Sequence, residues 1–192
     1  PRKKMRLGFK YSWSEMAILQ DNWENLARQL DGTFSTLKVR SVANTSDSTR
    51  KFKLTIPTDG DQITILSTEF NPLKLNCTFN FNSDNEFLIY PEDFTDKISK
   101  FFGYKEIQLD DPEFDKAFMI RSKNLEFVRK LLSIRMRRFL LENYVTNFKY
   151  ENQKNNSILE LNVTIDELDN NKMLQAINIF NECTLILKNN LP

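Results

Sequence analysis

Four carboxylates within six residues form the densest group of potential metal ligands in this 192-residue chain; they are Asp110, Asp111, Glu113 and Asp115. Hard divalent cations prefer oxygen ligands, and alternate residues of an extended segment project to the same side. However, Pro112 follows Asp111 directly, and the spacing of a calcium-binding loop is absent. Turn capping, with pairing to Lys116 or Arg121, explains the same carboxylates. The sequence therefore predicts a structural role, with a metal site as the alternative.

The strongest local positive charge follows between positions 121 and 138, in Arg121, Lys123, Arg129, Lys130, Arg135, Arg137 and Arg138. Nucleic-acid-binding proteins contact phosphates with such residues and stack bases on aromatic side chains. A helix break expected at Ser133 scatters the charges, and the polar positions of the predicted strands carry no aromatic residue. We expect no nucleic-acid binding. We expect a solvated basic face of Arg129, Lys130, Arg135, Arg137 and Arg138, with an acidic protein partner or an anionic membrane as the alternative contact.

Several catalytic designs are excluded by composition. The chain has no histidine, which rules out Ser-His-Asp and Cys-His catalysis. Its 4 glycines are isolated, so they cannot build a glycine-rich phosphate loop. Cys77 and Cys183 fall on predicted apolar faces and are expected to be two buried thiols. These observations predict a non-catalytic chain without a cofactor.

The first third of the chain carries clear local signals. A capping box at Ser12–Glu15 and apolar residues at helical spacing predict a helix over 13–30. Strict alternation of apolar and polar residues predicts strands over 51–56 and 73–82, and more briefly at Leu37 and Val39. Thr58–Asp61 contains the Asp-Gly pair of a tight hairpin, and Asn44–Thr49 is expected to be a polar loop.

The remaining elements complete the expected fold. Tyr90-Pro91 is expected to open a short helix that ends at Gly103, and Asp111–Ser122 is expected to be extended. Helices on either side of Ser133, strands over 144–151 and 158–165, and a helix over 169–189 follow. The sequence predicts an α+β fold, an antiparallel sheet with helices packed mainly on one face. We expect one domain over 1–192, with a two-part layout, 11–103 and 104–192, as the alternative.

The segment from Gly103 to Glu142 resembles a segment of uncharacterised bacterial proteins. In that family a D-P-x-F-D-x-x-F-x-V/I strand precedes a leucine-rich helix pair, and this chain has Asp111-Pro-Glu-Phe-Asp-Lys-Ala-Phe-Met-Ile at the same place. Proteins of the family are often membrane-associated. The resemblance implies a bacterial origin and attaches no chemistry to the segment.

The predicted function is a non-catalytic interaction or accessory domain. No apolar run reaches the ~18 residues that span a bilayer. The basic residues from Pro1 to Arg6 favour a membrane anchor upstream, which would hold the domain on the cytoplasmic side; a trimmed tail is the alternative. A second hypothesis is a site for a small apolar or lipid ligand, lined by Phe52, Phe79, Phe81, Phe148 and Phe180. A third is an enzyme that uses the carboxylates of 110–115 with a divalent cation.

Overall fold

The fold is known from a computed structural model, which describes residues 11–40, 48–68, 72–93 and 103–190. Its elements in chain order are α1 (Trp13–Gln29), β1 (Thr33–Arg40), β2 (Ser48–Thr58), β3 (Asp61–Thr68), β4 (Leu73–Phe79), β5 (Phe87–Pro91), β6 (Lys105–Ile107), α2 (Pro112–Ala117), β7 (Phe118–Ser122), α3 (Leu125–Leu131), α4 (Ile134–Glu142), β8 (Tyr144–Asn152), β9 (Ser157–Thr164) and α5 (Asn170–Asn189).

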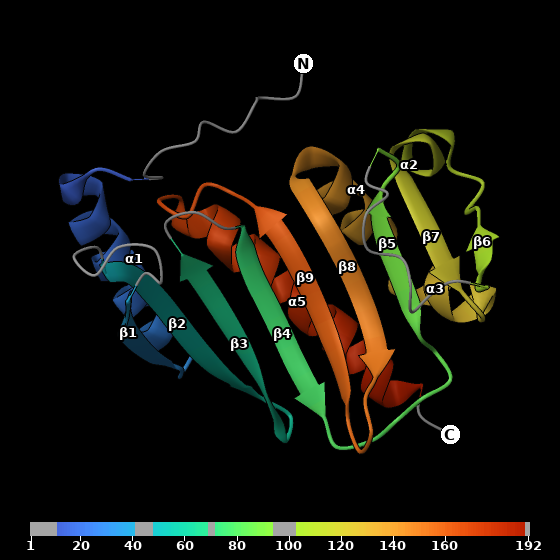
Figure 1. The fold of residues 1–192 in the computed structure, drawn as a ribbon, viewed down its shortest axis with the longest axis horizontal. Helices are drawn as coiled ribbons and strands as arrows, with labels where there is room; N and C mark the ends of the chain where they lie inside the picture. The colour runs from blue at the N-terminus through green and yellow to red at the C-terminus, as the bar shows by residue number, and fades with distance from the viewer. Residues whose placement is uncertain (1–10, 41–47, 69–71, 94–102, 191–192) are drawn as a thin grey trace.

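The strands of the described residues form one nine-stranded sheet, in the order β1-β2-β3-β4-β9-β8-β5-β7-β6 (Figure 1). Every neighbouring pair in this order is antiparallel. β4 and β9, which are far apart in the sequence, meet at the centre, where Leu75 pairs with Leu161. This confirms the predicted antiparallel α+β fold.

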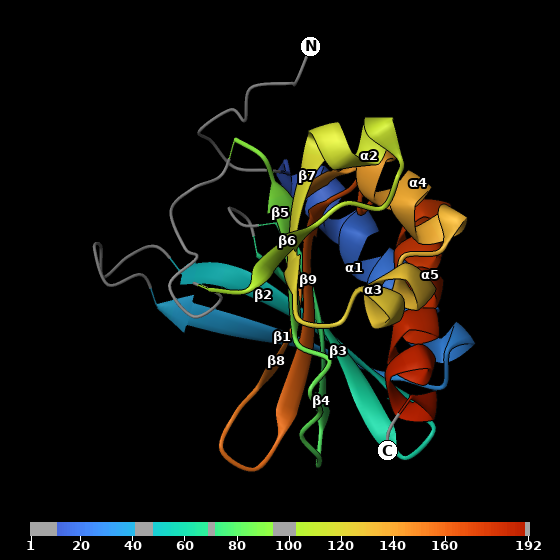
Figure 2. The same cartoon turned by 90° about the vertical axis from the view of Figure 1, so that its right-hand side faces the viewer.

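The helices gather on one side of the sheet, as predicted. Figure 2 shows α1, α3, α4 and α5 on the same side, and Figure 1 shows α5 running behind the central strands. Between the two layers, one connected cluster of buried apolar side chains extends from Met16 in α1 to Leu187 in α5. We call the side of the sheet that meets the helices the covered face.

Local signals explain why α1 forms where it does. The Ser12 hydroxyl accepts a hydrogen bond from the Glu15 backbone N–H, and the Glu15 carboxylate accepts one from the Ser12 N–H. This capping box satisfies amides that have no partner inside the helix. Leu19 and Trp23, at most 1% exposed, lie on the buried side of the helix. The predicted helix is thus confirmed.

The alternation that predicted the strands is seen in their burial. From Ile63 onward in β3 and throughout β4, every second residue is buried, and the residues between are partly or fully exposed. Thr58 pairs with Asp61 across the predicted hairpin, where Gly60 has a φ of +81° that favours glycine. β1 differs from its neighbours: Phe34 packs against Trp23 and Phe52, while Leu37 is 47% exposed.

Two sequence predictions were wrong. Tyr90 and Pro91 do not open a helix; they end β5, and Pro91 pairs with Phe118 of β7. Proline is tolerated there because the end of a strand needs fewer backbone N–H donors. The predicted extended segment is helical in its first half, since Pro112–Ala117 forms α2 before β7 begins. The helix expected up to Gly103 otherwise falls on 94–102, which lies outside the described residues.

Two further predictions fall partly or wholly outside those residues. The basic segment from Pro1 to Arg6 lies there, as does 44–47 of the expected polar loop, whose last residues, Ser48 and Thr49, begin β2. None of the helices in the described ranges combines the length and the apolar composition needed to cross a bilayer.

Candidate functional site

The side of β2, β3, β4, β9 and β8 opposite the helices carries a broad polar surface, which we call the open face. None of the described helices lies on it (Figure 2). Its side chains follow from strand register, because residues next to buried positions point away from the core. They include Lys51, Lys53, Thr55, Thr64, Leu66, Lys74, Asn76, Asn147, Lys149, Glu151, Glu160 and Asn162.

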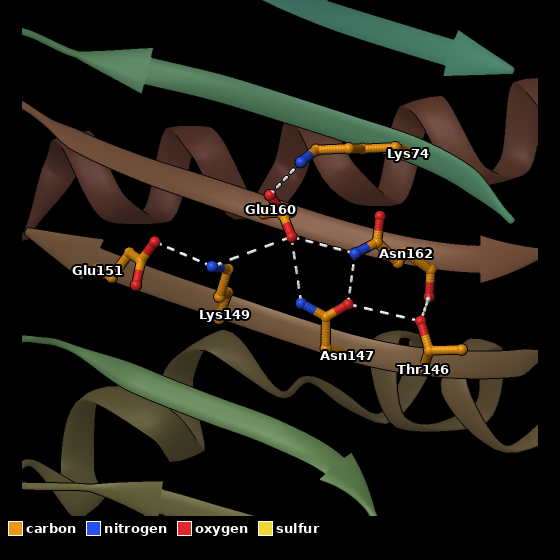
Figure 3. A network of polar contacts seen from close by, with 7 residues as sticks. All are labelled: Lys74, Thr146, Asn147, Lys149, Glu151, Glu160 and Asn162. Atoms are coloured by element: carbon orange, nitrogen blue, oxygen red, sulfur yellow. Dashed lines mark hydrogen bonds and ion pairs between the residues drawn. The ribbon is translucent and has the colours of Figure 1, made fainter. Parts of the chain in front are cut away.

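Glu160 of β9 is the centre of a polar network on the open face (Figure 3). Its Oε2 atom lies 2.5 Å from the Lys74 Nζ on β4. Its Oε1 atom accepts hydrogen bonds from Asn147 Nδ2 at 3.2 Å and Asn162 Nδ2 at 3.0 Å. On β8, Lys149 Nζ lies 4.0 Å from the same oxygen and 2.9 Å from Glu151. Three adjacent strands therefore share one set of polar contacts.

The network holds Glu160 in its charged form. Partial burial of this carboxyl raises its pKa, because burial disfavours charge. The hydrogen bond from Lys74, the positive charge of Lys149 and the hydrogen bond from Asn147 outweigh burial, so the pKa of Glu160 lies below its ordinary value of 4.5. The carboxylate is thus ionised at neutral pH and its hydrogen-bond partners are fixed around it.

A hollow of about 380 Å³ lies beside this network. Its lining in the described chain consists of Lys51, Leu66, Thr68, Pro72, Lys74, Thr146 and Asn162. The strands of the open face carry four lysines, Lys51, Lys53, Lys74 and Lys149, and two glutamates, Glu151 and Glu160, a net charge of +2. Both glutamates are paired with Lys74 or Lys149. Lys51 and Lys53 on β2 have no ion-pair partner within the described residues.

Two ion pairs join the predicted acidic group to the predicted basic face. Asp110 Oδ2 lies 2.9 Å from the Arg129 guanidinium, and Asp111 Oδ2 lies 2.9 Å from that of Arg137. Asp111 also caps α2, since its side chain accepts the Phe114 backbone N–H. Asp115 accepts the backbone N–H of Leu109 and of Asp111 itself. These contacts hold the loop before α2 against α3 and α4.

The remaining members of these two groups have separate surroundings. Glu113 and Arg138 are both exposed. Arg135 pairs with Glu182 at 2.7 Å, and Lys130 donates to Asn190. Arg121, an expected partner of the carboxylates, donates instead to Tyr90 Oη and the Tyr104 carbonyl.

A shared cation site among these carboxylates finds no support in this arrangement. No cluster of three or more His, Cys, Asp or Glu side chains that could hold a metal occurs in the ranges that the structure describes.

The five aromatic residues considered as a ligand lining belong to the core or pack against it. Phe79 packs against Phe81, with ring centroids 5.1 Å apart, and the Phe148 ring lies 5.0 Å from the Phe87 ring. Phe52, Phe79, Phe148 and Phe180 are at most 2% exposed. None of the five borders the hollow on the open face or the larger polar hollow at the end of the sheet.

Both cysteines are free and buried, as predicted. Burial raises the pKa of the Cys77 thiol to about 12 and that of the Cys183 thiol even further. At neutral pH both side chains are therefore protonated thiols, which are poor nucleophiles.

Sequence reasoning did not find the network around Glu160. Alternation placed Lys74 and Asn76 on the wet side of a strand, but Glu160 and Asn147 become their neighbours only through the β4–β9–β8 order. It also expected no aromatic residue on this face. Tyr144, which is 49% exposed, pairs with Thr164 at one end of it.

The fold is similar to that of a solved protein. The crystal structure of the mycobacterial trehalose monomycolate transport factor A, TtfA, superposes with a TM-score of 0.51 at 13% sequence identity. The match covers 88% of this chain and 95% of that chain. No protein-family model matches the sequence, and no curated protein matches it. At this identity the similarity is one of fold.

Proposed function

We propose that this chain is a non-catalytic accessory domain whose open face binds an acidic segment of a partner protein. The observation that carries the proposal is the pair Lys51 and Lys53, two cations without an ion-pair partner in the described residues, beside a network in which the other charges are already matched. Complementary charge between such a surface and its partner favours the correct partner and raises the rate of association. Neutral side chains on the neighbouring strands β3 and β4, such as Thr64 and Asn76, add hydrogen-bonding groups to the same face.

A protein segment suits this face better than an anionic membrane. Each lysine near an anionic bilayer contributes about 1 kcal/mol, so two unpaired lysines supply only about 2 kcal/mol. Membrane binding of that strength needs inserted apolar or aromatic side chains in addition. Leu37 and Tyr144 are exposed singly, on β1 and β8, which are not neighbours. A peptide, by contrast, can also use the hydrogen-bonding groups between the lysines.

Fluorescence anisotropy with a labelled peptide of alternating Glu and Ser tests the proposal. We expect saturable binding that the double variant Lys51→Glu, Lys53→Glu weakens by about tenfold or more. The matched control carries the same charge change at Lys116 of α2 and Arg138 of α4, which are exposed on helices and not on the strands of this face. It should weaken binding by less than about twofold.

Three outcomes would overturn the proposal. They are absence of saturable binding, equal loss in the two double variants, and binding to phosphatidylserine vesicles but not to the peptide. Equal loss would mean that only net charge matters. Circular dichroism of both variants establishes that each is folded.

Lipid binding is a second candidate, favoured by the fold similarity to a transport factor. Lipid binding requires an apolar cavity. The five aromatic residues considered as a lining lie in the core or pack against it, and none of them borders either hollow of the described residues. Binding would thus require the helices to move away from the covered face. Native mass spectrometry of the purified chain, compared with its denatured mass, distinguishes the two candidates. A carried lipid that is lost in Phe79→Trp would favour this second function; a bare chain would count against it.

A further inference from the structure

A second, larger hollow lies near the end of β8 and the C-terminal end of α5. Its volume is about 650 Å³, within the range of small-molecule sites. Four separate segments build it: the loop after β4, the start of α3, the end of β8 and the C-terminal end of α5. The described lining consists of Asn82, Ser83, Asp84, Asn85, Asn124, Glu126, Phe127, Lys130, Asn152, Asn189 and Asn190.

Six of these lining residues are asparagines, so we call this the asparagine hollow. Its floor is held by hydrogen bonds between the segments. Asn152 Nδ2 donates to the Ser83 carbonyl at 2.8 Å, and Asn152 Oδ1 accepts the Ser83 N–H at 3.1 Å. Asn124 Nδ2 donates to Asn85 Oδ1 at 2.8 Å. Because these contacts exist without a ligand, a ligand would find the floor already ordered.

Some amide groups around the hollow remain available for a ligand. An asparagine side chain offers two N–H donors and one oxygen acceptor. Asn85 uses its oxygen in the bond from Asn124, which leaves its amide N–H groups as donors. The side chain of Asn189 is exposed and makes no hydrogen bond within the described part of the chain. The hollow thus offers donors and acceptors together, mostly on uncharged groups.

The lining argues against charged and apolar ligands. In the described lining, Asp84 and Glu126 outnumber the cation Lys130, which already donates to Asn190; Arg129, which lies 3.8 Å from Glu126, does not line the hollow. This net negative lining repels phosphates and carboxylates. Phe127 is the one apolar side chain in the described lining and is only 3% exposed, so a hydrocarbon would gain little contact. The carboxylates form no metal cluster with a third acidic ligand in the described residues.

We infer that the asparagine hollow binds a neutral, polyhydroxylated ligand of the saccharide class. Each sugar hydroxyl is a donor and an acceptor, as is each free side-chain amide, so the two sets of groups match. The inference is independent of the open face, because none of the residues that line this hollow belongs to the network of Glu160. It would stand if the acidic-peptide proposal failed.

Titration of the ¹⁵N-labelled chain with maltose, cellobiose and chitobiose, followed by NMR, tests the inference. We expect at least one disaccharide to shift side-chain amide resonances saturably, with a dissociation constant of about 1 mM because the ligand is small. Glucuronate and inorganic phosphate are the charged comparisons and should produce no saturable shift at the same concentrations.

Two asparagine variants locate the site. Asn85→Leu and Asn189→Leu should each weaken disaccharide binding by about threefold to tenfold, as expected for a lost hydrogen bond. Asn155→Leu is the matched control, because Asn155 is exposed in the β8–β9 turn but does not line the hollow. Its affinity should equal that of the parent chain. Well-dispersed spectra of all three variants confirm their folding.

The inference is overturned by three results. One is the absence of a saturable shift with all three disaccharides. Another is equal or tighter binding of glucuronate or phosphate, which would make the hollow an anion site. The third is an unchanged affinity in Asn85→Leu and Asn189→Leu, which would place the binding elsewhere on the protein.

Discussion

The covered and open faces of the same strands differ in what their side chains contribute. On β4, Leu73, Leu75 and Cys77 are fully buried against the helical layer, whereas Lys74 and Asn76 between them reach the open face. The covered face contributes apolar burial and close packing, which dominate folding stability. The open face contributes ion pairs and amide hydrogen bonds that water can replace. Its residues can therefore change with little effect on the fold, as binding surfaces do.

The strongest test of this difference between the faces is to truncate two neighbouring residues of β8 that lie on opposite faces. Phe148→Ala should lower the free energy of unfolding by about 3–5 kcal/mol, because it leaves a cavity beside Phe87. Lys149→Ala removes exposed-side ion pairs and should cost less than about 1 kcal/mol. Urea unfolding measures both. Similar losses in the two variants would show that the open face is as important for stability as the core.

A smaller effect is expected where the polar contacts belong to the helical layer. Asp111→Ala removes the cap of α2 and the ion pair with Arg137, and should cost about 1–2 kcal/mol. Asp111→Asn keeps a capping oxygen and should cost less than about 1 kcal/mol. Glu113→Ala, at an exposed neighbouring position, should stay within about 0.5 kcal/mol. Thermal unfolding should rank the losses of stability of the three variants in this order. An inverted order would contradict the role of Asp111 in capping α2 and pairing with Arg137.

A small effect is also expected at the centre of the open face. Glu160→Gln should cost about 1 kcal/mol or less at pH 7. The pKa of Glu160 is lower in the folded chain, so its contribution is complete above its ordinary pKa of 4.5 and is lost as the pH falls through the folded value.

The pH dependence is the distinguishing measurement for this variant. The difference in free energy of unfolding between Glu160→Gln and the parent chain should shrink as the pH drops below about 4.5. Glu126→Gln, whose carboxylate is largely exposed, is the control and should show no comparable change. A difference that grows on acidification would contradict the Glu160 assignment.

The elements that the sequence predicted well are those with local causes. The capping box at Ser12 and Glu15, the turn at Gly60 and the alternation in β4 each act within a few residues, so one sequence suffices to find them. α2 was missed although Pro112 follows a capping residue, because Phe114 and Phe118 were assigned to a strand. Their spacing of four is helical, and their rings lie 5.0 Å apart. At Pro91 the error was the reverse: a helix was predicted to begin there, but the residue ends strand β5.

The candidate sites depend on contacts that sequence reasoning cannot supply. Lys74, Lys149 and Glu160 come from three strands, and their proximity follows from the insertion of β9 between β4 and β8. The same limit applies to Asp111 and Arg137, which were assigned to separate groups although they form one ion pair. Local chemistry identified which side chains are polar, and the order of the strands determines which of them interact.

The pairing of β4 with β9 also constrains how the chain is made. Synthesis proceeds from the N-terminus, so β1–β4 leave the ribosome long before Ser157–Thr164 is available. Until then one edge of β4 has no partner, and an unpaired edge can pair with other chains. The centre of the sheet is thus completed last, by residues of high sequence separation, which slows folding. A chain truncated before β9 should aggregate during expression.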